Sequence, residues 1–263
     1  MKRHIYFLLI VTITGCGSPA TKQPASLTGA YSMLSQTFGG NALDTTYTQH
    51  KQLKIYAGNY MMYVRLSPAD SLSAFGIGTY TADTSRLIEN IIYSAADTIE
   101  INSLYSDTIN IAKTAIGFEQ AVPKIKSDKG DISLTEEYES VGTAATSPLD
   151  GCWKQVSGYS VTGTDTVRWT DVQYKAFYAG NFAIGNVQTA RNNITHAGIS
   201  YGTFVMDGNT VRETITASTW AALNGQSFEV AITFKGPDAF TQTIIQKDGT
   251  KEVLFYERMG KKA

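Results

Sequence analysis

The chain has few of the residues that enzymes and metal proteins use most often. Among its 263 residues are 2 cysteines, 3 histidines and 6 prolines. A catalytic metal site usually draws on two or three histidines that lie close together, and His50 and His196 occupy unrelated places in the chain. The formal net charge is −1, which argues against a nucleic-acid groove, because such a groove needs a basic stripe. We therefore expect no metal, no cofactor and no nucleic-acid partner.

The N-terminus has the pattern of an export signal. Lys2 and Arg3 precede a short apolar run, which ends at the tetrapeptide Ile-Thr-Gly-Cys at positions 13–16. A basic start, a short apolar segment and small residues at its end predict a secretory signal peptide, because the run is too short to span a bilayer. The alternative for Cys16 is a cysteine that follows an ordinary signal peptide by chance.

The Ile-Thr-Gly-Cys ending resembles the lipobox of bacterial lipoproteins. The resemblance implies a signal peptide over residues 1–15, cleavage before Cys16 and lipidation of that cysteine, so that the membrane is a partner through a lipid anchor. Residues 16–26 then form the lipidated end and a flexible tether. Gly17 stands where an aspartate would resemble an inner-membrane retention signal, which favours the outer membrane within the cell envelope. With Cys16 lipidated, Cys152 is left without a disulfide partner and we expect it to be a small buried residue.

The remaining chain repeats itself. Leu27-Thr28-Gly29-Ala30-Tyr31 recurs as Leu149-Asp150-Gly151-Cys152-Trp153, and Tyr-Ala-Gly-Asn-Tyr at 56–60 recurs as Tyr-Ala-Gly-Asn-Phe at 178–182. Both pairs are 122 residues apart (149 − 27 and 178 − 56). We therefore expect two homologous domains, over residues 27–142 and 149–260, joined by a linker of small residues at 143–148.

Within each copy apolar residues return at alternate positions, as in Thr210-Val211-Arg212-Glu213-Thr214-Ile215. This period of two is typical of strands, and turn signals such as Asp207-Gly208-Asn209 separate the runs. About eight short strands in roughly 115 residues is the size at which an up-and-down sheet closes on itself. The expected fold class is all-β, with two tandem antiparallel up-and-down barrels.

The Leu-x-Gly-x-Trp opening of the second copy, the Tyr-Ala-Gly-Asn-Phe segment, Gly-Thr-Phe at 202–204 and the terminal Tyr-Glu at 256–257 resemble the lipocalin-like domains of secreted and lipid-anchored proteins of Gram-negative bacteria. The first copy departs from the pattern at Tyr31, which stands in place of the tryptophan. The resemblance implies lipocalin-like barrels and assigns no activity, because these domains mostly have no known biochemical role.

One string suggests an enzyme. Gly198-Ile199-Ser200-Tyr201-Gly202 matches the Gly-x-Ser-x-Gly of hydrolases, in which a strand turns sharply into a helix. Here strand and hairpin patterns follow the serine, and the aligned position of the first copy is Gly76. We therefore interpret the string as a turn before a strand, name no catalytic residue and expect no enzyme.

Glu89 and Glu213 occupy aligned places among alternating apolar residues. A carboxylate on the apolar face of a strand must be hydrogen-bonded, paired or protonated. It would either anchor the polar head of a ligand or pair with a residue of its own barrel. Six further side chains are predicted to line the two cavities or, alternatively, to fill a core: Tyr60, Met62, Tyr80, Phe182, Ile184 and Phe204.

Two functions are open from the sequence. The first is a lipid-anchored envelope protein that binds a small apolar or amphipathic ligand inside lipocalin-like barrels. The alternative is a structural or protein-interaction subunit of an envelope complex, with filled barrels and an envelope protein as partner. The space around the two glutamates distinguishes them.

Overall fold

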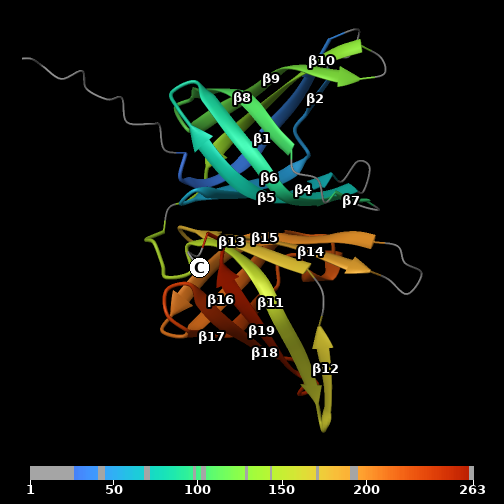
Figure 1. Ribbon diagram of the computed structural model, residues 1–263, viewed down its shortest axis with the longest axis vertical. Helices are drawn as coiled ribbons and strands as arrows, with labels where there is room; N and C mark the ends of the chain where they lie inside the picture. Colours follow the sequence, from blue (N-terminus) through green and yellow to red (C-terminus); the bar gives the residue numbers. More distant parts are fainter. Residues whose placement is uncertain are drawn as a thin grey trace, which may run out of the picture.

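The computed structural model describes residues 27–40, 45–67, 72–96, 99–101, 105–127, 130–142, 144–169, 172–189 and 195–260. These residues form two closed antiparallel β-barrels in tandem, each of eight strands (Figure 1). The predicted fold class is therefore confirmed. The signal peptide, Cys16 and the tether lie outside the described residues and stay predictions. Among the described residues no helix is long and apolar enough to cross a membrane.

The first barrel is a meander closed by its first and last strands. Tyr31 of β1 pairs with Ser140 of β10, and this pairing completes the ring. Short strands β2 (Thr45–Tyr47) and β7 (Ile99–Ile101) add to the outer edges of β1 and β6. The ring strands are β1 (Gly29–Gly39), β3 (Lys51–Ala57), β4 (Tyr60–Ser67), β5 (Leu72–Ala82), β6 (Arg86–Ala96), β8 (Tyr105–Lys113), β9 (Gly117–Ser127) and β10 (Gly130–Ser140).

The second barrel repeats the meander. Trp153 of β11 pairs with Arg258 of β19, and this pairing closes the ring. Strand β12 (Asp165–Trp169) forms a hairpin with the far half of β11, and the 3₁₀ turn η1 (Ala221–Leu223) connects β16 to β17. The ring strands are β11 (Gly151–Thr162), β13 (Val172–Tyr178), β14 (Asn181–Thr189), β15 (Thr195–Asp207), β16 (Thr210–Ser218), β17 (Ser227–Phe234), β18 (Ala239–Ile245) and β19 (Lys251–Arg258).

The repeated pentapeptide is used in two different registers. In the first copy Ala57 pairs with Tyr60, so the two-residue turn is Gly58-Asn59. In the second copy Tyr178 pairs with Asn181, so the turn is one residue earlier, at Ala179-Gly180, and both turn residues have positive φ angles of 45° and 84°. A shift of one residue moves every side chain of a strand to the other face. The sequence repeats at 122 residues here, but the fold repeats at 121 (180 − 59).

This shift corrects two predicted positions. Phe182 lies in the core of the second barrel. Met62 lies instead in the cluster between the two barrels, and Tyr60 packs against that cluster from its edge. Neither Tyr60 nor Met62 therefore lines the interior of the first barrel.

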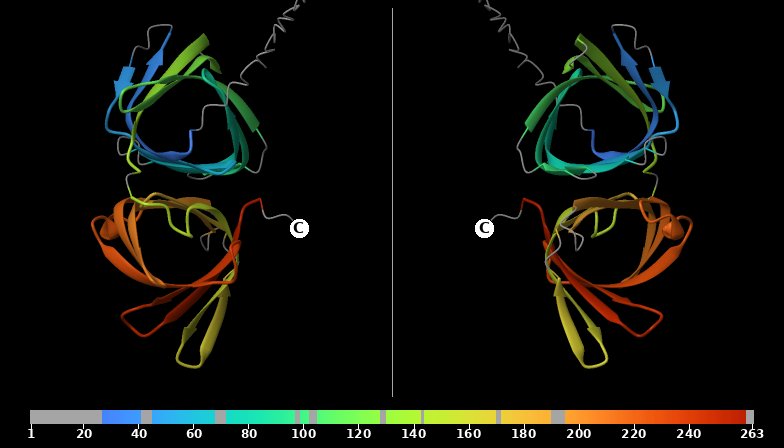
Figure 2. Two further views of the ribbon diagram at one scale, coloured as in Figure 1. Left: turned by 90° about the vertical axis from the view of Figure 1, so that its left-hand side faces the viewer. Right: turned by 90° about the vertical axis from the view of Figure 1, so that its right-hand side faces the viewer.

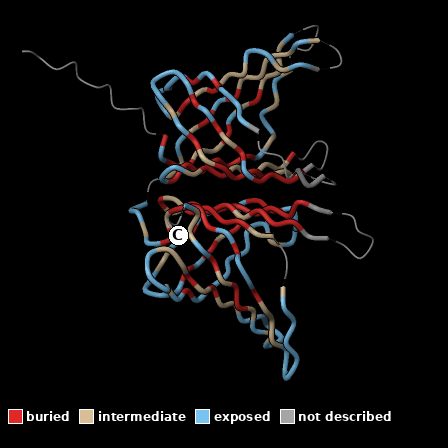
Figure 3. The backbone as a smooth tube through the Cα atoms, viewed as in Figure 1, coloured by how far each residue is buried: buried red, intermediate tan, exposed pale blue. Residues whose placement is uncertain are grey.

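The barrels lie side by side and share an apolar face (Figures 2 and 3). Bulky residues of one wall fit against small residues of the other, and a Cβ atom added to Gly185 would lie 2.4 Å from the ring of Phe75. The hydroxyl of Ser73 donates a 2.6 Å hydrogen bond to the carbonyl of Ala197 across the interface. The first barrel contributes Ala30, Leu53, Ile55, Ala57, Met62, Val64, Phe75, Ile77, Tyr93 and Ala95; the second contributes Cys152, Tyr174, Ala176, Ala183, Val187, Ala197, Ile199, Tyr201 and Ala217.

Candidate functional site

The interior of the first barrel contains a buried ion pair. Lys54 of β3 reaches across to Glu89 of β6, with Nζ 3.1 Å from Oε1, and its ammonium also donates to Oε1 of Gln120 on β9 at 3.0 Å. The hydroxyl of Tyr56 donates to the same carboxylate at 2.5 Å. The side chains of Lys54 and Glu89 are only 5% and 8% exposed. The carboxylate that the sequence singled out thus has partners within its own barrel.

The second barrel contains the same three residue types on the corresponding strands. Lys175 of β13 lies 3.2 Å from Oε1 of Glu213 on β16 and donates to Oε1 of Gln242 on β18 at 2.7 Å. The ammonium also lies over the rings of Phe177 and Tyr256, 5.7 and 5.6 Å from their centroids. Phe177 stands in the place of Tyr56, so Glu213 lacks the phenolic hydrogen bond that Glu89 accepts.

Each barrel interior contains a charge pair within a triad: Lys54–Glu89–Gln120 in the first barrel and Lys175–Glu213–Gln242 in the second. The ion pair and the hydrogen bond to the amide offset part of the free-energy cost of burying the charges. A buried charge must be paired and hydrogen-bonded, because leaving water costs several kcal/mol per ion. Burial, together with the negative charge of Glu89, raises the pKa of Tyr56 well above 10. Burial, together with Glu213, does the same for the pKa of Tyr256. Both phenols therefore stay neutral at physiological pH and can donate.

Among the residues that the structure describes, the network extends beyond the triad in the first barrel only. Glu136 accepts hydrogen bonds from Gln36 at 2.7 Å and from Tyr138 at 2.8 Å, and the amide of Gln120 links it to the first triad. Oε1 of Gln36 lies 2.9 Å from Nδ1 of the half-buried His50. In the first barrel Glu136 of β10 pairs with Gln36 of β1. The corresponding pair of the second barrel is Leu254 of β19 with Gly158 of β11. The two interiors are thus similar in the triad and different in their outer layer.

The remaining predicted lining residues are core residues of their barrels. Tyr80 belongs to the core of the first barrel, Phe204 belongs to that of the second, and Ile184 packs against the latter while partly exposed. The ligand-binding role predicted for these residues stays a prediction. The predicted turn at the Gly-x-Ser-x-Gly string is wrong, because residues 198–202 all lie within strand β15. The hydroxyl of Ser200 is hydrogen-bonded to that of Ser218 at 2.9 Å.

Sequence reasoning missed the two lysines. A signal was present, because Gln52-Leu53-Lys54-Ile55-Tyr56 and Gln173-Tyr174-Lys175-Ala176-Phe177 share the pattern Gln-x-Lys-x-aromatic at an offset of 121 residues (173 − 52). All three patterned side chains of each segment turn inward, and Gln52 and Gln173 bond the hydroxyls of Tyr138 and Tyr256. A lysine that alternates with inward-facing residues is a candidate partner for an inward-facing glutamate. Within the described part of the chain, no group of three or more His, Cys, Asp or Glu residues could hold a metal ion.

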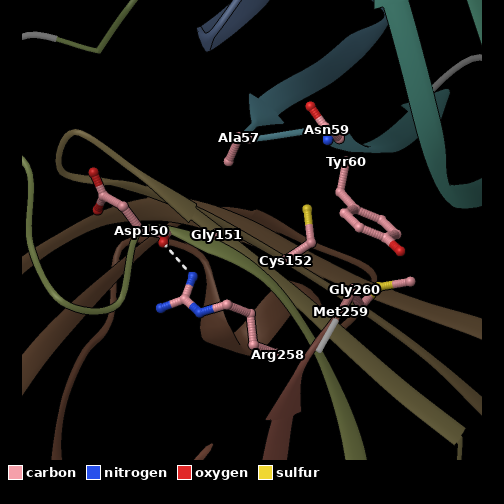
Figure 4. A pocket seen from close by; sticks show the side chains of 10 residues that line it. Ala57, Asn59, Tyr60, Asp150, Gly151, Cys152, Arg258, Met259 and Gly260 are labelled. Atoms are coloured by element: carbon pink, nitrogen blue, oxygen red, sulfur yellow. Dashed lines mark hydrogen bonds between the residues drawn. The ribbon is translucent and has the colours of Figure 1, made fainter. Parts of the chain in front are cut away.

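A cavity of about 310 Å³ lies outside both barrels, at the seam where they meet (Figure 4). Arg258 closes one side, because its guanidinium donates to the carbonyls of Asp150 and Pro148 at 2.7 and 3.0 Å and stacks 4.1 Å from the centre of the Trp153 ring. Burial raises the pKa of the Cys152 thiol to about 12, so the thiol is protonated at neutral pH. The lining residues are Ala57, Gly58, Asn59, Tyr60, Asp150, Gly151, Cys152, Arg258, Met259 and Gly260.

Comparison with known proteins adds little to this geometry. No protein-family model and no curated protein matches the chain. Among solved structures, the chain is similar to the isotype 1 transferrin binding protein B from serogroup B Neisseria meningitidis, with 12% identity and a TM-score of 0.20. The match covers 84% of this chain and 60% of that chain. A likeness at this level carries no inference about function.

Proposed function

We propose that the protein is a non-catalytic interaction module of a bacterial cell envelope, with two filled barrels that act as one rigid body. The observation that carries this proposal is the internal pairing of Glu89 and Glu213. A carboxylate that anchors the head group of a ligand should not already be paired with a charged residue of its own barrel. Here Glu89 accepts from Lys54 and Tyr56, and Glu213 accepts from Lys175.

The shared face between the barrels gives a reason for the doubling. Each barrel alone would expose a contiguous apolar wall, and soluble monomers rarely leave a large apolar patch uncovered. The second copy covers the first, and the tight fit at Gly185 and Phe75 supports a fixed relative orientation. Binding surfaces on such a body would keep constant distances from one another, which suits a scaffold.

The path of the chain is compatible with a lipid anchor at one end of the tandem of barrels. Strand β1 begins at Gly29, and the last strand ends at Arg258 on the same side of the tandem as the linker (Figure 1). A lipid on Cys16 would therefore place this end toward the membrane and the β11–β12 hairpin away from it. The anchor is tested by Cys16→Ser, which should move the protein from the membrane fraction to the soluble fraction. Membrane association that survives the substitution contradicts the anchor.

A second candidate function rests on the seam cavity. Its volume of about 310 Å³ is at the lower end of the range for small-molecule sites. Tyr60, Cys152 and Met259 supply apolar surface there, and Asp150 and Arg258 supply polar groups. This candidate keeps small-molecule binding but moves it from the barrel interiors to the interface between them.

Native mass spectrometry of the protein purified from its own envelope tests the proposal. A bare mass, repeated across preparations, supports filled barrels. A stoichiometric adduct that Ala57→Leu removes supports the seam cavity, because the longer side chain would occupy it. An adduct that survives Ala57→Leu and is lost with Tyr80→Ala or Phe204→Ala contradicts the proposal and supports a ligand inside a barrel.

A further inference from the structure

The hairpin of β11 and β12 projects beyond the wall of the second barrel (Figures 1 and 2). Within the described residues β12 pairs with β11 alone, so its other edge is free. Four of its five residues are exposed, and Trp169 is half-buried against the core. An exposed strand edge offers unpaired backbone groups to another strand, and proteins usually shorten, bend or cover such edges.

The hairpin register decides which backbone groups are free. Thr162 pairs with Asp165 across the two-residue turn Gly163-Thr164, and this closing pair is hydrogen-bonded. Hydrogen-bonded and non-bonded pairs alternate along an antiparallel ladder. Asp165, Val167 and Trp169 therefore direct their backbone groups toward β11. Thr166 and Arg168 direct theirs outward.

Thr166 and Arg168, whose backbone groups point outward, flank Val167, and this arrangement allows a second copy of β12 to pair with the free edge. In an antiparallel arrangement with a two-fold axis perpendicular to the sheet, Val167 faces its own counterpart, and Thr166 of each copy faces Arg168 of the other. Both Thr166–Arg168 pairs are then hydrogen-bonded pairs, so all four outward groups of each strand find partners. The central Val167 pair is of the non-bonded kind, whose side chains approach most closely.

We propose that the protein forms a two-fold homodimer through β12, with the axis through Val167. The exposure of this residue supports the assignment, because Val167 is 60% exposed and its counterpart would cover it. Strand β2 of the first barrel is also an edge, but it has three residues, whereas β12 has five. The contact is small, so the dimer is weak and forms at high local concentration, as on a membrane surface. The proposal does not depend on whether the barrels are filled.

Disulfide cross-linking tests the axis. In the full chain carrying Cys16→Ser, the one remaining native thiol is Cys152, which is buried. Val167→Cys should oxidise rapidly to a covalent dimer, because a non-bonded antiparallel pair has its Cα atoms about 4.5 Å apart, within reach of a disulfide. The matched variants Thr166→Cys and Arg168→Cys change exposed neighbours and should cross-link several-fold more slowly, because neither residue faces its own counterpart.

Sedimentation velocity over a range of concentrations tests the dimer itself. The wild type should show a dimer that grows with concentration, and Thr166→Pro should remove it. Proline at this position deletes an outward N–H and leaves the β11–β12 ladder intact. An unchanged thermal midpoint confirms that the variant is folded, and Thr166→Val serves as the control that keeps the N–H. A wild type that stays monomeric at every concentration overturns the proposal, and so does fastest cross-linking at position 166 or 168.

Discussion

Glu213→Gln removes one charge of the Lys175–Glu213 pair and leaves the ammonium of Lys175 in the barrel interior. The lysine side chain is 2% exposed and the glutamate side chain 9% exposed, so water screens little of the loss. Breaking a buried pair by removing one partner costs about 3–5 kcal/mol. For two barrels that unfold together as one body, about 1 kcal/mol shifts the unfolding midpoint by roughly 2–4 °C. Glu213→Gln should therefore lower the midpoint by on the order of 10 °C.

Differential scanning calorimetry measures this shift, and the neighbouring strand offers a matched control. Arg212 and Glu229 form an ion pair at 3.0 Å, and both side chains are about two-thirds exposed. Glu229→Gln should cost less than about 1 kcal/mol, because exposed pairs contribute little. The double variant Lys175→Met/Glu213→Leu should recover most of the stability, since it removes both charges together. If Glu213→Gln unfolds at the wild-type temperature, the carboxylate is no structural partner and the reasoning is wrong.

Four further outcomes are expected. Gly185→Ala should destabilise the protein by about 1–3 kcal/mol in urea unfolding, because the added Cβ would lie 2.4 Å from the Phe75 ring; Phe75→Leu should partly restore the loss, and no loss would contradict a rigid interface. Tyr56→Phe should cost about 1.5–3 kcal/mol through the hydrogen bond lost to Glu89, and a neutral result would mean that Lys54 and Gln120 satisfy this carboxylate alone. Burial raises the pKa of Tyr256 well above 10, so this phenol stabilises the fold below pH 10 and the stability falls at higher pH as the unfolded chain ionises; absorbance at 295 nm should show buried phenols ionising only with unfolding, and Tyr256→Phe should flatten the decline. Because the Cys152 thiol has a pKa of about 12, a thiol reagent at pH 8 should modify it only in denaturant, and rapid native labelling would contradict its burial.

Much of the fold was predictable because it follows from local patterns. Alternating apolar residues identified the strands, and turn residues such as Gly208 marked a hairpin that the structure contains. The repeat predicted two similar barrels, because two segments with the same pattern satisfy the same packing rules. These signals are local in sequence, and a closed meander is built almost wholly from neighbours in sequence.

Which face of each strand points into the barrel was harder to predict. The matching pentapeptides at 56–60 and 178–182 suggested equivalent faces, but Ala179 takes a left-handed conformation that moves the turn by one residue. The core of the second barrel accepts Phe177 and Phe182, whereas the first barrel turns Tyr56 and Met61 inward. Which face is buried depends on the partner across the barrel, and no local pattern contains this information.

Half of the candidate site could be predicted from the sequence. Glu89 and Glu213 were identified because a carboxylate among alternating apolar residues needs a partner, but the partners lie 35 and 38 residues away in sequence. The shared face between the barrels was not predicted, because its strands are apolar on both sides and the sequence does not reveal which wall meets the other copy. The seam cavity depends on the same packing and was missed for the same reason.

The proposed function requires barrels that are filled by their own side chains. A crystal structure of the protein purified from its own envelope tests this most directly. We expect Lys175 and Glu213, and equally Lys54 and Glu89, to lie within hydrogen-bond distance, with no electron density other than protein and water beside them. Continuous density of a bound molecule between either lysine and its glutamate would contradict the proposed function.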